Sequence, residues 1–411
     1  MRIRYSRQKD GKPVRKAFVY TREEHGIAIA DVDKDAVYIV ERLKASGNES
    51  YIVGGAVRDL ILGKKPKDFD IVTSASPSRI KKLFRNSRII GRRFRLVHVY
   101  FDQKIFEVST FRSIKDGHTG NTFGSIEEDV LRRDFSLNAL FYDPGEEVVV
   151  DYVGGMRDIR NKKIRPIIPL PIIFKDDPVR MIRAVKYAAS TGFKIPLSLG
   201  WKIKQQAPLL AEVSPSRLTE EINKIINSPC APAIIQQLME LGLFVYLQPQ
   251  AFQLMQKDKG YRKMYLEGFC AAGKQPSAPA GQKGEKLACL IREYLNRTIA
   301  WDMPPAEIYK EAFQGARNFV LPMNPPRIEL DDAVRLVFRE HEIVLKRNRI
   351  FERPRTGKRS SDKTPPPADG SGGGEEGRKR KRRRRARRNP QEGALNTGKE
   401  GQEIPAGPDH P

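Results

Sequence analysis

The sequence predicts a mixed α/β domain, followed by a mainly helical region and a tail without a folded core. Three observations support this division. Short β-type runs alternate with helical patterns between residues 27 and 150, and we expect about five strands there. After Asp151 the β-type runs largely stop and helical patterns take over. From Arg353 onward Pro, Gly and charged residues dominate, a composition that cannot bury a core and predicts disorder.

The α/β domain follows a polar, basic segment over residues 1–26, which we expect to be an N-terminal arm or a poorly ordered start. Apolar residues at helical spacing predict a helix over 35–46. Ser76 and Pro77 are typical of an N-cap and a first helical residue, so a second helix is expected to begin there. The remaining elements expected here are strands at 51–53, 69–73, 88–90, 95–101 and 105–111, and a short helix at 56–62.

The second half of the chain is expected to be mainly α-helical. The predicted helices are 178–190, 215–227, 231–241 and 331–347.

The charge of the chain indicates a phosphate-rich partner. The 411 residues carry a formal charge of +25, and ten of the eleven residues of Arg378–Arg388 are Lys or Arg. Such a charge favours nucleic acid and disfavours an acidic protein substrate. A run of like charges can be merely solvated and disordered, but it also predicts non-specific, salt-sensitive binding of the RNA backbone.

Cysteine content and hydropathy exclude several classes of protein. The three cysteines are scattered and include no CxxC pair, which disfavours a disulfide scaffold and a cysteine-rich zinc module. No run of about 18 apolar residues occurs, so we expect no membrane association and a cytoplasmic location.

Two carboxylates mark the first candidate site. Asp68 and Asp70 stand two residues apart at the start of a β-type run, so their side chains project from the same face. Two such carboxylates repel each other unless a cation lies between them, and hard oxygen ligands suit Mg²⁺. The alternative is a charged loop at a strand entrance, because the DxD pattern alone is common.

A glycine pair precedes these carboxylates. Gly54 and Gly55 follow a β-type run and precede a helix, where small residues let backbone N–H groups approach a phosphate. Arg58 falls one turn into that helix and can reach the same anion. The alternative is a plain strand–helix turn. The segment is neither a Walker A loop nor a GxGxxG motif.

Together these residues form the stretch GGAVRDLILGKKPKDFDIV, which resembles the head motif of the class II nucleotidyltransferases. That superfamily comprises bacterial poly(A) polymerases and CCA-adding enzymes. The resemblance runs from about Tyr51 to Asn227, and more loosely through the later helices. It implies that Asp68 and Asp70 hold two catalytic Mg²⁺ ions. Glu107 matches an acidic strand position of the family and is a candidate third ligand, with an exposed strand residue as the alternative.

A second segment, LRRDFSLNAL, resembles the family's RRDF motif. The resemblance implies that Arg133 contacts the nucleotide and that Asp134 is a further acidic active-site residue, which holds the ribose or the geometry of the site. Asn138, one helical turn later, is expected to support Asp134. The alternative is an ordinary helix start with polar pairs at i,i+4 spacing.

A third segment, DDPVRMIR, resembles the family's nucleotide-selection motif. Asp177 is expected to cap the following helix, on which Arg180 and Arg183 share a face. A carboxylate accepts hydrogen bonds and a guanidinium donates them, so an Asp177–Arg180 pair suits adenine and cytosine rather than uracil and guanine. The alternative is a capped helix with two solvated arginines. The family usually has Glu at the position of Asp176.

Other segments favour the poly(A) polymerase branch of this family. GRRFRLVHV, FGSIEED and the Arg-rich tail are similar to that branch, whereas the loop between Arg112 and Phe123 is short for it. The resemblance implies template-independent transfer of AMP from ATP to RNA 3′ ends, with release of pyrophosphate. The alternatives are a CCA-adding tRNA nucleotidyltransferase and an inactive basic RNA-binding protein on the same fold.

The resemblance also divides the chain into functional parts and names its partners. We expect RNA 3′ ends and ATP as partners, with RNA-decay proteins as further candidates. Gly55, Arg58, Arg133 and Arg183 are expected to hold phosphate or ribose. The expected parts are a basic arm at 1–26, a catalytic head at 27–150, a helical neck with the selection motif at 151–230, a helical RNA-binding body at 231–352 and a disordered tail at 353–411.

Overall fold

The computed structural model describes residues 2–7, 13–91, 96–115, 122–273 and 283–345. The chain divides into two units, Met1–Phe351 and Glu352–Pro411, and every described residue belongs to the first unit. The predicted tail therefore lies outside the described residues.

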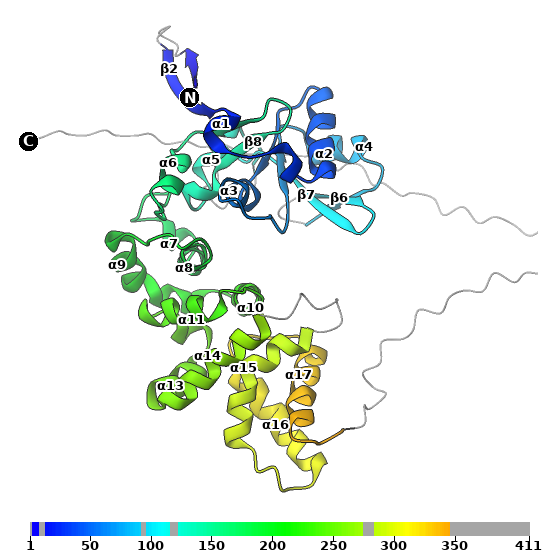
Figure 1. The fold of residues 1–411 in the computed structure, drawn as a ribbon, viewed down its shortest axis with the longest axis vertical. Helices are drawn as coiled ribbons and strands as arrows, with labels where there is room; N and C mark the ends of the chain where they lie inside the picture. The colour runs from blue at the N-terminus through cyan, green and yellow to red at the C-terminus, as the bar shows by residue number, and fades with distance from the viewer. Residues whose placement is uncertain (1, 8–12, 92–95, 116–121, 274–282, 346–411) are drawn as a thin grey trace, which may run out of the picture. The chain divides into compact units, whose positions relative to one another are not determined.

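A single mixed β-sheet organises the α/β part (Figure 1). Within the described ranges it contains nine strands in the order β1-β2-β9-β8-β3-β4-β7-β6-β5. β4 and β7 are parallel, and the other neighbouring strands are antiparallel. The strands are β1 (Arg2–Arg7), β2 (Pro13–Tyr20), β3 (Ser50–Val53), β4 (Asp70–Thr73), β5 (Ser87–Ile90), β6 (Leu96–Phe101), β7 (Lys104–Thr110), β8 (Leu140–Asp143) and β9 (Val148–Asp151).

The sheet is wider than the expected five strands because four strands were missed. The predicted strands are β3 to β7, and the missed strands β1, β2, β9 and β8 form one side of the sheet. β8 and β9 have four residues each and are buried along most of their length. Short buried strands lack the alternation that marks a half-buried strand, so the sequence pattern did not reveal them.

Of the two expectations for residues 1–26, a poorly ordered start is wrong for the described part of that segment. β1 and β2 pair as antiparallel strands, and β2 joins the sheet by pairing Phe18 with Asp151 and Tyr20 with Val149 of β9. Tyr20 is buried. The partner strand lies more than a hundred residues away in sequence, which is why a local reading of basic residues suggested disorder.

Two layers of apolar side chains cover the two faces of the sheet. In β3, Ile52 belongs to a core cluster that also contains residues of α2, α3 and α4, whereas Tyr51 and Val53 belong to a second cluster with Ile126 and Val130 of α5. This division follows from the alternation of side chains along a strand. The helices of this part are α1 (Arg22–His25), α2 (Lys34–Ala45), α3 (Gly55–Ile61), α4 (Pro77–Leu83), α5 (Ile126–Leu131) and α6 (Gly155–Arg160).

Local capping explains where these helices begin. Ser76 accepts a hydrogen bond from the backbone N–H of Arg79, with Pro77 at the first helical position, which confirms the predicted start of α4. Asp33 caps α2 by accepting from the N–H of Asp35. These side chains satisfy N–H groups that have no partner inside the helix.

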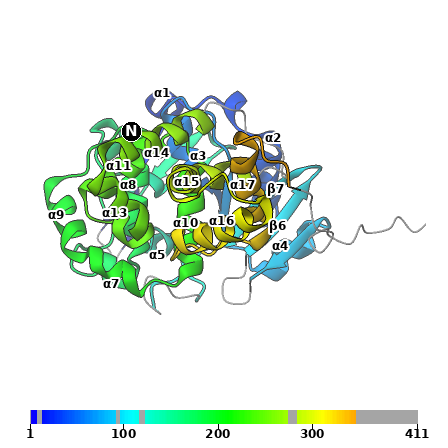
Figure 2. The same cartoon turned by 90° about the horizontal axis from the view of Figure 1, so that it is seen from below.

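The remainder of the described chain is helical (Figures 1 and 2). The larger core cluster continues from the sheet through these helices to α17. None of the helices in the described ranges is long and apolar enough to cross a membrane. They are α7 (Ile173–Asp176), α8 (Val179–Thr191), α9 (Leu197–Gln206), α10 (Pro215–Ile226), α11 (Ala231–Glu240), α12 (Phe244–Leu247), α13 (Pro249–Lys257), α14 (Lys259–Gly273), α15 (Lys283–Thr298), α16 (Pro305–Phe319) and α17 (Arg327–Glu340).

The predicted helices at 178–190, 215–227 and 231–241 correspond closely to α8, α10 and α11. The helix predicted at 331–347 is displaced. α17 begins at Arg327, directly after Pro326, and ends at Glu340. Proline favours the entry to a helix, and we underrated this signal.

Candidate active site

A cavity of about 820 Å³ gathers most of the residues singled out from the sequence. Its walls come from the β3–α3 turn, β4, β7, the segment between α5 and β8, and α7, α8 and α10. Asp68 and Arg58 are outside the lining. The predicted residues that line it are Gly54, Gly55, Asp70, Glu107, Arg133, Asp134, Asn138, Asp177, Arg180 and Arg183.

Asp70 is the first residue of β4 and lies against two neighbouring strands. Its register partner on β3 is Val53, and the parallel pairing of Ile71 with Val108 brings Glu107 of β7 alongside. Desolvation raises the pKa of Asp70 to about 6, with further contributions from the charges of Glu107 and Asp68 that Arg133 only partly offsets. The carboxylates are therefore close enough to repel each other.

The acidic side chains suit a hard cation but do not form a finished metal cluster. Among the residues that the structure describes, no group of three His, Cys, Asp or Glu side chains is arranged to hold a metal ion. Glu107 is half exposed, and its Oε1 lies 3.5 Å from Nε2 of His98. The carboxylates that repel each other nevertheless supply oxygen ligands, which are the ligands that Mg²⁺ prefers. The roles of Asp68, Asp70 and Glu107 as ligands of such an ion stay predictions.

The backbone conformation at Gly54, the first residue of the glycine pair, requires a glycine. Gly54 has φ of 73°, in the left-handed region that L-residues with side chains rarely adopt. A side chain there would also point toward the site, since its Cβ would lie 3.7 Å from Oδ2 of Asp70 and 4.0 Å from Nη1 of Arg133. Both glycines line the cavity, and their expected role in the approach of a phosphate stays a prediction.

Arg58 lies beside the glycine turn, since its Nη2 is 3.5 Å from the position that a Cβ on Gly55 would occupy, and its expected contact with an anion stays a prediction. Its Nη1 donates to Oδ1 of Asn138 at 2.8 Å, its Nε donates to Asp59 at 2.9 Å, and its guanidinium lies over the ring of Tyr187. Asn138 belongs to a 3₁₀ turn, Ser136–Asn138, rather than to an α-helix. Arg58 therefore orients Asn138 in this structure, and the expected contact of Asn138 with Asp134 is replaced by this one.

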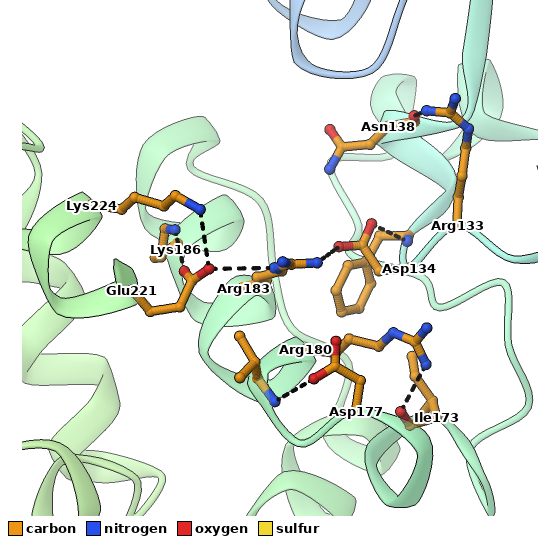
Figure 3. Close-up of polar contacts among 12 residues, drawn as sticks. Arg133, Asp134, Asn138, Ile173, Asp177, Arg180, Arg183, Lys186, Glu221 and Lys224 are labelled. Carbon is orange, nitrogen blue, oxygen red and sulfur yellow. Dashed lines mark hydrogen bonds and ion pairs between the residues drawn. The ribbon is translucent and has the colours of Figure 1, made fainter. Parts of the chain in front are cut away.

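Arg133 is held by a buried acid that the sequence reading missed. Oδ2 of Asp129 accepts from Nε and Nη2 of Arg133 at 3.2 and 2.9 Å, and its Oδ1 accepts from the backbone N–H of Arg112 at 3.2 Å. Nη1 of Arg133 donates to the backbone carbonyl of Asn138 at 3.3 Å (Figure 3). The guanidinium of Arg133 lies over the ring of Phe141. The i,i+4 spacing of Asp129 and Arg133 could have revealed this pair.

Two further arginines of the same wall were not assigned a role from sequence. Arg112 and Arg132 both line the cavity. Desolvation lowers the pKa of Arg132 to about 10, and the neighbouring charge of Arg112 adds to this effect. Mutual repulsion of this kind is relieved by an anion, such as a phosphate group.

Arg183, which belongs to the helical wall, lies between two acidic side chains (Figure 3). Its Nη1 is 3.8 Å from Oδ2 of Asp134, and its Nε is 3.6 Å from Oε1 of Glu221. Burial lowers the pKa of Arg183, but Tyr187 and these acids outweigh burial and raise it. Glu221 is buried and also receives hydrogen bonds from Lys186 and Lys224, and sequence reasoning missed it.

The proposed base-reading residues are buried at the start of α8. Oδ1 of Asp177 accepts from the N–H of Val179 at 3.2 Å, which confirms its capping role. The same oxygen accepts from Nη2 of Arg217 on α10 at 2.8 Å, a partner 40 residues away that the sequence reading missed. Arg180 donates to the backbone carbonyl of Ile173 at 3.1 Å. Arg180 and Arg183 both line the cavity, so they are not a solvated pair.

Two family models match this chain. The poly A polymerase head domain matches residues 50–165. The second, described as the probable RNA and SrmB-binding site of polymerase A, matches residues 192–255.

Curated relatives decide the family. The CCA-adding enzyme of Geobacillus stearothermophilus is 37% identical over 280 residues, which cover 66% of this chain and 67% of that protein. The chain belongs to the family of poly(A) polymerases and CCA-adding enzymes. Within this family, poly(A) polymerase I of Salmonella typhi is 43% identical over 247 residues, 56% of this chain and 53% of that protein. The chain thus spans about half the length of the curated poly(A) polymerases that it matches.

A solved structure supports the predicted fold of this family. The Bacillus stearothermophilus CCA-adding enzyme in complex with CTP has a TM-score of 0.52 and 29% identity, over 75% of this chain and 83% of that chain. The α/β head followed by helices, predicted from the sequence, is therefore confirmed. The relatives and the fold are those of nucleotidyltransferases.

Proposed function

We propose that the chain transfers AMP from ATP to RNA 3′ ends without a template and releases pyrophosphate. The observation that supports this most is one cavity lined by a carboxylate that fits Mg²⁺, by arginines suited to phosphate and by a buried acid–arginine pair suited to a base. Poly(A) polymerases share the higher identity, 43%, although over a smaller part of this chain than the CCA-adding enzymes.

Different side chains would bind the triphosphate, the ribose and the base of the nucleotide. Arg133 and Arg183 would hold the triphosphate and ribose through charge-assisted hydrogen bonds, with Arg112 and Arg132 adding positive charge. Asp177 and Arg180 would accept from and donate to the pairing edge of adenine. Because most of these groups already have partners in the protein, they are oriented before the nucleotide arrives.

The reaction itself needs the primer 3′-oxygen in line with the α-phosphorus. The 3′-hydroxyl loses its proton to water, a new P–O bond forms from its oxygen to the α-phosphorus, the bond to the bridging oxygen breaks, and the electron pair of that bond leaves with pyrophosphate. Mg²⁺ held by Asp68 and Asp70 would supply Lewis-acid activation of the hydroxyl and charge neutralisation of the triphosphate. Arg133 and Arg183 would hold the triphosphate while the negative charge moves to the leaving group.

Primer and nucleotide choice together test this proposal. The purified chain is incubated with ATP or CTP and Mg²⁺, on oligo(A) and on tRNA that lacks its CCA end. A long A tail on oligo(A) supports polyadenylation. Addition of only C, C and A to tRNA would overturn it.

CCA addition is the second candidate, and a specific observation favours it. The CCA-adding enzymes match a larger share of the chain, 66%, and are matched over more of their own length. The chemistry is the same, and the selection residues Asp177 and Arg180 accept adenine and cytosine alike. The same incubation distinguishes the two candidates.

A further inference from the structure

A buried network of hydrogen bonds holds the turn between α5 and β8. Asp158 of α6 is 4% exposed, and Ser136 is fully buried. Oδ2 of Asp158 accepts from Oγ of Ser136 at 2.6 Å and from Nε of Arg165 at 2.7 Å. Arg165 also donates through Nη2 to the backbone carbonyl of Val153. These side chains thus join α6, the 3₁₀ turn Ser136–Asn138 and the segment that precedes α7.

The backbone of the same segments is paired as well. The N–H of Ser136 donates to the carbonyl of Arg165 at 3.0 Å, and the N–H of Ile167 donates to the carbonyl of Asp134 at 3.1 Å. Gly155 packs so closely against the turn that a Cβ on it would lie 2.3 Å from the carbonyl oxygen of Ser136. Side-chain and backbone contacts together therefore fix the turn against α6 and against the segment that contains Arg165.

The turn carries cavity residues on both sides of Ser136. Asp134 and Asn138 each lie two residues from Ser136 and line the cavity. The network itself is outside the lining. A buried ion pair is a weak source of stability, because desolvation offsets much of its attraction, but satisfied hydrogen bonds restrict its geometry. The pair of Asp158 and Arg165 is therefore suited to orient the two cavity residues.

The chemistry of Asp134 and Asn138 matches a sugar hydroxyl. A carboxylate repels a phosphate group but accepts a hydrogen bond from a hydroxyl. Oδ2 of Asp134 is 3.8 Å from Nη1 of Arg183, which is proposed to hold the nucleotide (Figure 3). Nη1 of Arg58 donates to Oδ1 of Asn138, so the N–H groups of that amide are the donors that a hydroxyl oxygen can meet. The ribose is the part of a nucleotide that carries hydroxyls.

We propose that Asp158 is a positioning residue, which acts through Ser136 and Arg165 to hold Asp134 and Asn138 against the ribose hydroxyls of the nucleotide. The preference for ATP over deoxy-ATP then depends on a carboxylate that lies outside the cavity. This inference rests on the proposed function and deepens it, because it names the residues that determine the choice of sugar. No motif read from the sequence includes Asp158 or Arg165.

Nucleotide binding measures this preference without a primer. The Kd of the purified chain for ATP, 2′-deoxy-ATP and 3′-deoxy-ATP is determined with Mg²⁺ by isothermal titration calorimetry. We expect the wild type to bind ATP more tightly than at least one deoxy analogue. The readout is the ratio of the Kd of that analogue to the Kd of ATP, which a loss of folded protein does not change. Equal Kd values for the three nucleotides would overturn the inference.

Ser136→Ala is the sharpest variant, because it removes one hydroxyl and leaves the ion pair of Asp158 with Arg165 in place. The Kd for ATP should rise about 10-fold while that for the deoxy analogue changes little, so the ratio falls toward 1. Asp158→Asn should lower the ratio in the same way. Arg165→Lys should lower it by a smaller factor, because lysine lacks the fork that bonds Asp158 and Val153 together.

A matched control is Ser50→Ala in β3. Ser50 is also fully buried and donates from Oγ to Oγ1 of Thr73 at 2.8 Å, but it is outside the cavity lining. Melting temperatures are measured for both alanine variants, so that a general loss of stability is seen in each. An unchanged ratio in Ser136→Ala, or an equal change in Ser50→Ala, would overturn the positioning role.

The design separates this inference from the proposed function, because binding is measured without RNA. If the ratio falls in Ser136→Ala but the wild type adds no nucleotide to RNA, the positioning role of Asp158 stands and the proposed function fails. If tails form normally and the ratio is the same in Ser136→Ala as in the wild type, the positioning role is wrong and the proposed function stands.

Discussion

The two walls of the cavity hold their arginines in different ways. On the head side, Arg133 is paired with Asp129, four residues away on the preceding helix. On the helical side, Arg217 reaches Asp177 from 40 residues away, and Arg183 meets Glu221 on a different helix. A local pair forms as soon as its own segment folds, whereas the long-range pairs exist only when α8 and α10 pack together.

This difference predicts how the loss of an acidic side chain affects each wall. Loss of an acid on the head side should disturb one arginine. Loss of Glu221 should disturb the packing of α8 against α10 together with the site, because Glu221 contacts Arg183, Lys186 and Lys224. The following predictions test this contrast, from the largest expected effect to the smallest.

Asp70→Asn should have the largest effect on activity. The charge that suits Mg²⁺ is lost while the shape of the side chain is kept, so nucleotide addition should fall on the order of 10³-fold. The rate of AMP incorporation and the melting temperature are measured together. Glu146→Gln, at an exposed position outside the cavity, serves as control. Normal activity of Asp70→Asn would refute its role.

Asp129→Asn should lower kcat/KM for ATP about 100-fold through Arg133. The amide accepts fewer charge-assisted bonds, so the guanidinium of Arg133 loses its fixed orientation. In an Arg133→Ala background, Asp129→Asn should add little further loss, because both changes remove the same interaction. Additive losses in this double-mutant cycle would contradict a local clamp.

Glu221→Gln should lower both stability and activity, about 3 kcal/mol and about 10-fold respectively. Desolvation raises the pKa of Glu221, but Lys186, Lys224 and Arg183 outweigh it and hold the pKa below 4.5. The carboxylate therefore contributes stability above pH 4.5, and this contribution is lost as the pH falls through the lower folded-state pKa.

Urea unfolding of the wild type and the Glu221→Gln variant at pH 7, and again at pH 4 and below, checks this dependence. The difference in unfolding free energy should shrink as the pH falls. A constant difference would show that Glu221 does not act through its charge.

Arg217→Ala should have the smallest effect on stability, below about 1 kcal/mol, because the Arg217 side chain is half exposed. Its contact with Asp177 nevertheless fixes one carboxylate oxygen at the cavity wall. We therefore expect weaker discrimination against UTP and GTP, measured as the ratio of kcat/KM for ATP to that for each competitor. An unchanged ratio would show that Arg217 does not contribute to nucleotide selection.

Sequence patterns predicted the central strands and the start of several helices because these depend on local signals. Ser76 and Pro77 mark the start of α4, and Asp177 caps α8 as expected. The patterns did not reveal β8 and β9, which are short and buried, or β1 and β2, which join the sheet where β2 pairs with β9, more than a hundred residues away. They also did not show that the guanidinium of Arg58 pairs with Asp59 and Asn138, and its assignment to an anion stays a prediction.

The sequence by itself determined the family and predicted the glycine turn and the carboxylates of the site, because these depend on residue types at short, regular spacings. Tertiary structure alone decided which partners orient them. Arg217 and Glu221 belong to no motif read from the sequence, and Asp129 ends the FGSIEED segment without having been assigned a role there. Asp129 and Glu221 hold Arg133 and Arg183, and Arg217 holds Asp177. A buried ion pair depends on which side chains the packing of helices and strands brings within about 4 Å, and sequence spacing shows this only within one helix.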